Sequence, residues 1–140
     1  MKKVLTLVAF LFCTAFLGAE PEPPKPIDLT GIYELHGAEK TDGGDIAYAG
    51  MVILKKKDEG YVAQWCMGPG ANIVGIAAVD DGFLVCAWQA QSRLGVTRYK
   101  IDCGGKKLSG KWMAVPLLNW HEETLTYKLP FPQKKDLKGT

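Results

Sequence analysis

Short runs of β-branched and aromatic residues, separated by turns that contain glycine, occupy the chain from residue 31 to residue 129. Such runs are typical of β-strands joined by tight hairpins. The pattern predicts eight strands, at residues 31–36, 48–56, 60–66, 72–79, 83–89, 95–102, 107–114 and 121–128. Strands that follow one another through short turns are antiparallel neighbours, so the predicted topology is a meander.

The predicted strands have no predicted helix to cover them, because no stretch of this region shows an amphipathic helical period. An open meander would leave two exposed strand edges, and closing the meander on itself removes them. We therefore predict an all-β fold, an eight-stranded antiparallel up-and-down meander barrel. A small two-sheet sandwich is the alternative.

The alternation of side chains along each strand indicates which face is inside. In the sixth run Arg98 and Lys100 share one face, so the face of Tyr99 points inward. In the second run Tyr48, Gly50, Val52 and Leu54 are assigned to the interior. The candidate interior and ligand-binding residues are Tyr61, Trp65, Trp88, Tyr99, Trp112, His121, Glu123 and Tyr127.

The stretch "WHEETLTY" at residues 120–127 places two carboxylates next to each other. Their parity separates them: Glu122 belongs to the solvent face and Glu123 to the interior. A buried carboxylate is costly unless it is hydrogen-bonded, protonated or paired, and no inward Lys or Arg is predicted to pair with it. Three interpretations stay open: a structural hydrogen-bonded group, a polar anchor in an apolar ligand cavity, or a general acid or base together with His121.

The aromatic interior leaves a second question open. An eight-stranded barrel is just wide enough to be filled by side chains or to hold one small ligand. Three tryptophans and three tyrosines could fill it, which is the simpler expectation, or they could line a pocket. Trp120, at the start of the last strand, is expected to cap an open end.

The first 19 residues have the pattern of a secretory signal peptide. Lys2 and Lys3 precede an apolar run that ends at Leu17, and small residues follow, with cleavage predicted after Ala19. The run is shorter than the about 20 residues of a transmembrane helix. We expect an exported protein, periplasmic or secreted, without a stable membrane insertion. Phe12 before Cys13 is a poor fit to a lipoprotein cleavage site, so no lipid anchor is expected.

The remaining chain divides by composition. Residues 20–30 are rich in proline and are predicted to form an extended linker, residues 31–129 to form the barrel domain, and residues 130–140 to form a mobile polar tail. The full chain has 17 Lys and Arg against 15 Asp and Glu. Removing Lys2 and Lys3 with the signal peptide leaves 15 of each, so nucleic acid is not an expected partner.

Three cysteines follow the predicted signal peptide, Cys66, Cys86 and Cys103. No two of them are predicted to meet in disulfide geometry, so we expect at least one free thiol. The cysteine and histidine spacing matches no zinc motif, and neither a metal nor a cofactor is predicted.

Several motifs form an ordered series over residues 31–126: "GIYELHG", "YAGMVILKKKDEGYVAQW", "VGIAAVDDGFLVCAW", "GVTRYKIDCGGKKLSGKW" and "EETL". This series resembles that of a group of small exported bacterial all-β proteins, which look like lipocalin- or avidin-like barrel modules. Some of them are labelled fibronectin-binding proteins. This chain departs from the series at residues 37–47 and in its cysteines. The resemblance implies a barrel with Glu123 at a motif position, and it supplies neither catalytic residues nor a ligand.

Together these observations predict an exported, non-enzymatic binding module, a monomer, that binds a small apolar ligand or an exported or extracellular protein. One alternative is a protein-binding module with a packed core, either adhesin-like or inhibiting a protease through residues 20–29. Another alternative is a hydrolase that uses Glu123 and His121. A purely structural protein of the cell envelope is also compatible with the sequence.

Overall fold

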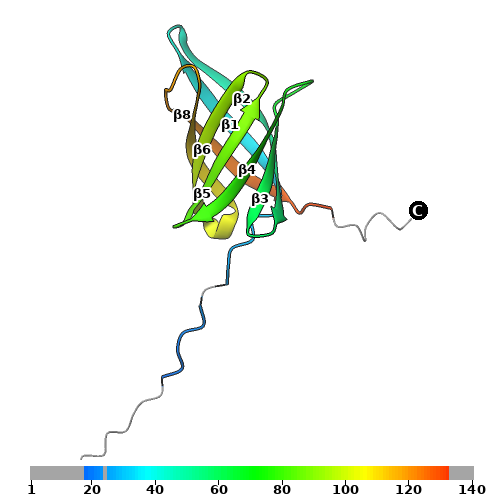
Figure 1. Ribbon diagram of the computed structural model, residues 1–140, viewed down its shortest axis with the longest axis vertical. Coiled ribbons are helices and arrows are strands. Elements are labelled where there is room, and N and C mark those ends of the chain that lie inside the picture. Colours follow the sequence, from blue (N-terminus) through cyan, green and yellow to red (C-terminus); the bar gives the residue numbers. More distant parts are fainter. Residues whose placement is uncertain (1–17, 24, 133–140) are drawn as a thin grey trace, which may run out of the picture.

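A computed structural model describes residues 18–23 and 25–132, and residues 31–129 form one closed antiparallel barrel (Figure 1). Its strands are β1 (Gly31–Thr41), β2 (Gly44–Lys57), β3 (Gly60–Cys66), β4 (Asn72–Asp80), β5 (Phe83–Ala90), β6 (Arg93–Asp102), β7 (Lys107–Ala114) and β8 (His121–Leu129). Each strand pairs with the next, and β1 pairs with β8 to close the barrel. The predicted meander barrel is confirmed, and the sandwich alternative is wrong.

Two predicted segments fall largely outside the described residues: the signal peptide, apart from residues 18–19, and the polar tail beyond residue 132. A single turn of 3-10 helix, η1 (Cys103–Gly105), connects β6 to β7. Within residues 18–23 and 25–132, no helix has the length and apolar character needed to span a membrane.

The hairpin of β1 and β2 corrects the predicted limits of these strands, which were residues 36 and 48. The paired ladder continues from Gly37 opposite Tyr48 to Thr41 opposite Gly44, and a two-residue turn joins the strands. Residues 37–47 contain Glu, Lys, Asp and Gly, which have low β propensity, but pairing along an existing ladder overrides this weak preference. The long hairpin projects beyond the rest of the barrel at one end (Figure 1).

The opposite end of the barrel is closed by Leu29, which lies in the predicted linker. Its side chain has no exposed surface. The Leu29 N–H donates to the Tyr61 hydroxyl at 3.1 Å, and the Tyr33 hydroxyl lies 3.0 Å from the Leu29 carbonyl oxygen. The prediction of an extended linker over residues 20–30 is therefore wrong at Leu29, which belongs to the packed domain.

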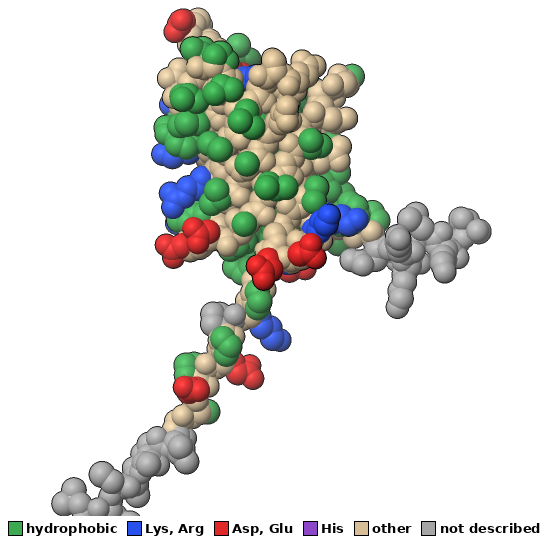
Figure 2. Space-filling model, viewed as in Figure 1, with side chains coloured by type: hydrophobic (Ala, Val, Ile, Leu, Met, Phe, Trp, Pro, Cys, Tyr) green, Lys and Arg blue, Asp and Glu red, His purple; other side chains and the backbone are tan. Residues whose placement is uncertain are grey.

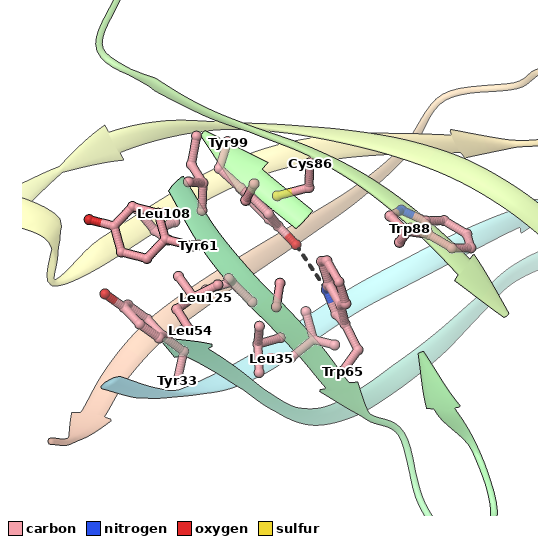
Figure 3. Packing of buried hydrophobic residues seen from close by; sticks show 14 of the residues in the cluster. Tyr33, Leu35, Leu54, Tyr61, Trp65, Cys86, Trp88, Tyr99, Leu108 and Leu125 are labelled. Carbon is pink, nitrogen blue, oxygen red and sulfur yellow. Dashed lines mark hydrogen bonds between the residues drawn. The ribbon is translucent and has the colours of Figure 1, made fainter. Parts of the chain in front are cut away.

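The closed half of the interior is a dense apolar core. Figure 3 shows Tyr33 and Tyr61 beside several of its leucines. Leucines without exposed surface are contributed by five strands: Leu35, Leu54, Leu84, Leu108 and Leu125. Burying each such side chain stabilises the fold by about 1.5–3 kcal/mol. The predicted inward faces of β3, β5, β6, β7 and β8 are confirmed, because each of these strands has a buried residue on its predicted inner face: Ala63, Cys86, Tyr99, Trp112 and Glu123.

The outer face carries apolar side chains as well as the predicted charges. Val62, Ile76, Ala87 and Val96 are cross-strand neighbours from β3 to β6, and all four are exposed. Figure 2 shows hydrophobic side chains spread over the face that these strands present. The sequence predicts charged residues on the outer face, and it does not predict this row of exposed apolar residues.

Candidate functional site: a cavity at the open end of the barrel

A cavity of about 240 Å³ lies inside the barrel at the end that carries the β1–β2 hairpin. Exposed Ile46 of this hairpin stands at its mouth, and buried Glu123 of β8 lies inside. Leu29 closes the other end of the barrel. The interior is therefore packed in one half and hollow in the other. From the sequence, a packed barrel and a hollow barrel are alternatives, and the structure has one half of each kind.

Glu123 is the buried carboxylate of the cavity, and only 7% of its surface is exposed. One carboxylate oxygen accepts a hydrogen bond from the Tyr48 hydroxyl at 2.8 Å, and the other accepts one from the Tyr99 hydroxyl. Burial raises the pKa of Glu123, and the two tyrosine hydrogen bonds oppose this without cancelling it. The inward orientation predicted for Glu123 is confirmed.

The two tyrosines are themselves held by tryptophans. The Trp112 Nε1–H donates to the Tyr48 hydroxyl at 2.6 Å. The Trp65 Nε1–H donates to the Tyr99 hydroxyl at 3.3 Å, a bond that Figure 3 shows as a dashed line. Two chains of donors, each running from an indole through a phenol, thus converge on Glu123. Because the five residues come from five strands, the network fixes the orientation of the carboxylate and the relative positions of those strands.

Glycines on neighbouring strands make room for the large rings. Trp88 of β5 is opposite Gly75 of β4 and Gly95 of β6. A side chain added at Gly95 would collide with the Trp88 indole, and one added at Gly37 would collide with the Tyr48 ring. The rings therefore lie across the neighbouring strand, and this placement keeps the centre of the open half from being filled.

The walls of the cavity are mostly aromatic. The rings of Trp88 and Trp112 meet edge to face, with centroids 5.8 Å apart. The Trp88 Nε1–H donates to Thr97 Oγ1 at 2.9 Å, so this indole also uses its only donor inside the protein. Met67 and Ile73 add aliphatic surface on the side of β3 and β4. This combination of apolar walls and few polar groups is typical of small-molecule sites.

Two opposite charges lie at the rim. The Arg93 guanidinium and the Glu39 carboxylate are 3.6 Å apart, and Arg93 Cζ lies 5.5 Å from the centroid of the Trp112 ring. Both side chains are partly exposed. The rim is thus nearly neutral and does not favour a ligand of one sign by itself.

His121 lies behind the cavity wall. Its ring packs against Trp112 in a tilted arrangement with centroids 4.3 Å apart, and its Nδ1 accepts a hydrogen bond from the Lys40 backbone N–H at 2.8 Å. Because Nδ1 is an acceptor, a neutral ring carries its proton on Nε2. His121 holds the β1–β2 hairpin and supports Trp112 from behind.

The predicted interior residues divide into three groups. Trp65, Trp88, Trp112 and Glu123 line the cavity. Tyr99 and His121 are buried and contact lining residues. Tyr61 and Tyr127 lie at the closed end, where Tyr127 contacts Tyr33 edge to face.

Other parts of the site were not predicted. Met67 comes from the loop between β3 and β4, where strand parity gives no orientation. Glu39 and Ile46 come from residues 37–47, which lie outside the predicted strands. Trp120, expected to cap an open end, is exposed and has the Lys111 ammonium 5.2 Å from its ring, and it does not line the cavity.

The thiols and the metal-binding side chains complete the chemical inventory. Cys66, Cys86 and Cys103 are all free, which confirms the prediction of at least one free thiol. Burial raises the pKa of Cys86 to about 12, so its thiol is unreactive near neutral pH. Over residues 18–23 and 25–132, no three His, Cys, Asp or Glu side chains come together in a way that could hold a metal ion.

A scan against protein-family models and a search of the curated proteins found no match to this chain. The resemblance to small exported barrel proteins stays a prediction from the motifs.

Proposed function

We propose that this protein is an exported, non-enzymatic binding module that holds one small, mainly apolar ligand in the open half of its barrel. The observation that carries the proposal is the cavity of about 240 Å³, with tryptophan walls and one buried carboxylate. Pockets for drug-sized ligands measure about 300–1,000 Å³, so the ligand is smaller than those. Leu29 supports the proposal, because it closes the other end and leaves one entrance.

A binding role is favoured over catalysis by the contacts of Glu123 and His121. The Glu123 carboxylate accepts from two tyrosines, whereas His121 Nδ1 accepts from the Lys40 backbone. No hydrogen bond joins Glu123 to His121 in the described part of the chain. A hydrolase that used the two as a catalytic pair would need them within hydrogen-bond reach of each other or of a common nucleophile.

The protein-binding alternative keeps one feature in its favour, the exposed row of Val62, Ile76, Ala87 and Val96 on the outer face. This row lies on the other side of the barrel wall from the cavity. The substitution Ile76→Lys therefore separates the two functions. It changes the outer surface and leaves a ligand in the cavity undisturbed.

A filled-cavity variant tests the proposal. Ala90 lines the cavity, and Ala87 of the same strand points outward. We expect 2-phenylethanol to quench or shift the tryptophan fluorescence of the wild type and of Ala87→Phe in a saturable way, and to leave that of Ala90→Phe unchanged. Binding that Ala90→Phe retains would overturn the proposal, and so would a wild type that binds neither 2-phenylethanol nor an amine, carboxylate or hydrocarbon of the same size.

The ligand itself can be sought in the protein purified from the cells that export it. Native mass spectrometry should show a bound mass that is lost on denaturation. The same measurement on Ala90→Phe should show the chain alone.

A further inference from the structure

The cavity offers acceptors in excess of donors. The indole protons of Trp65, Trp88 and Trp112 and the hydroxyl protons of Tyr48 and Tyr99 all point to partners within the protein. The Thr97 hydroxyl, which accepts from Trp88, keeps one proton of its own. A ligand whose polar group is an acceptor would therefore find few donors deep in the cavity, because the Arg93 guanidinium lies at the rim and is paired there with Glu39.

Glu123 supplies the unused acceptors. A carboxylate has about four lone-pair sites, and the two tyrosines occupy two of them. Glu123 makes no ion pair within residues 18–23 and 25–132, although it is almost fully buried. A buried carboxylate without a cation is costly, so a donor that carries a positive charge is the group that this position lacks.

The walls favour the same charge. The faces of indole rings attract cations, and they do so more strongly where water is excluded. Trp88 and Trp112 present their rings to the cavity that contains Glu123. An ammonium group on a short apolar body can satisfy both the carboxylate and the rings.

The geometry points to a small primary amine as the ligand class, with its ammonium group donating to Glu123 and its apolar body lying against Trp88 and Trp112. This inference rests on the proposed function, because it requires the cavity to hold a ligand. It adds that Glu123 selects among apolar ligands by charge. A carboxylic acid of the same size is the class that the site rejects.

The pH dependence of binding follows from the groups around Glu123. Titratable side chains near it come from three other strands and from its own: Tyr48 of β2, Cys86 of β5, Tyr99 of β6 and His121 of β8, with Glu39 and Arg93 at the rim. Burial and the charge of Glu123 raise the pKa values of Tyr48, Tyr99 and Cys86, so these three stay neutral near pH 7. A primary alkylamine keeps its proton below about pH 9.

A set of matched probes tests the inference: 2-phenylethylamine, 2-phenylethanol, propylbenzene and 3-phenylpropionate, titrated calorimetrically at pH 8. We expect the wild type to bind the amine at least about tenfold more tightly than the alcohol or the hydrocarbon, and to bind the carboxylate most weakly. Lowering the pH to 5 should weaken the binding of the amine and leave the binding of the alcohol unchanged, because Glu123 loses its charge when it is protonated.

The variant Glu123→Gln removes the charge and keeps the shape of the side chain. It should bind the amine no more tightly than the alcohol and should lose the pH dependence, and Glu122→Gln on the outer face should behave as the wild type. Any pH dependence of amine binding that persists in Glu123→Gln would come from another group and would count against the inference. If Glu123→Gln does not fold, the four probes and the two pH values decide on the wild type alone.

The outcomes separate the two proposals. If all four probes bind the wild type with similar affinity, the inference is wrong and the proposed function stands. If 3-phenylpropionate binds most tightly, the inference is likewise wrong and the proposed function stands. If no probe binds, or if Ala90→Phe binds them as well as the wild type does, both proposals are overturned.

Discussion

The two ends of the barrel interior use the same residue types in opposite ways. At the closed end, the hydroxyls of Tyr33 and Tyr61 bond to the backbone of Leu29, whose side chain fills the space between the strands. At the open end, the hydroxyls of Tyr48 and Tyr99 bond to a carboxylate, and the space remains. Aromatic residues inside a small barrel thus do not decide whether it is packed or hollow. The difference comes from the group that the tyrosines bind at each end, which is Leu29 at the packed end and the Glu123 carboxylate at the hollow end.

The largest expected effect tests the closed end. Leu29→Ala removes a fully buried side chain from a dense core, which costs about 2–5 kcal/mol of unfolding free energy. Ile27→Ala, at a largely exposed position that is also next to this end, should cost less than about 1 kcal/mol. Urea unfolding of the two variants measures the difference. Equal losses would show that Leu29 does not close the barrel.

The next effect tests the network at the open end. Tyr99→Phe leaves the Trp65 N–H without its acceptor and Glu123 without one donor, which should cost about 1–3 kcal/mol. Tyr127→Phe is the control, because the Tyr127 hydroxyl has no hydrogen bond in the part of the chain that the structure describes. Thermal and urea unfolding should place Tyr127→Phe close to the wild type. A similar cost for both substitutions would contradict the role of the network.

The smallest expected effect is a change in the slope of the unfolding free energy with pH. Burial raises the pKa of Glu123 above its ordinary value of 4.5, so the folded protein keeps a proton that the unfolded chain has lost. The stability from this group is fully present below about pH 4.5 and is lost as the pH rises through the raised pKa, with a slope of at most about 1.4 kcal/mol per pH unit. Glu123→Gln should remove this slope.

Unfolding free energies between pH 4 and pH 8 measure that slope, and exposed Glu122→Gln is the matched control. Asp28 and Glu34 have lowered pKa values and give the opposite slope, but they are present in all three proteins and cancel in the differences. Parallel pH profiles for the wild type and Glu123→Gln would mean that Glu123 has the same pKa in the folded and unfolded chains.

Strand parity was the most informative property of the sequence. It predicted the burial of Glu123, because the wall of a barrel has only two faces and the charged residues occupy one, whereas the meander was predicted from the short turns. It could not predict Leu29, since a proline-rich segment carries no period. It also missed residues 37–47, where pairing outweighs propensity. Whether a cavity remains depends on ring placement over Gly37 and Gly95, which is a matter of three-dimensional fit.

The closed end is also where the chain enters and leaves the barrel. β1 begins there and β8 ends there, with Ile32 opposite Leu129, and residues 18–23 and 25–28 extend away from that end (Figure 1). A support, a fluorescent protein or a cell surface joined through either flank of the domain would thus lie at its base. The open end of the barrel, which contains the cavity, then faces the surrounding solution whichever flank is used for attachment.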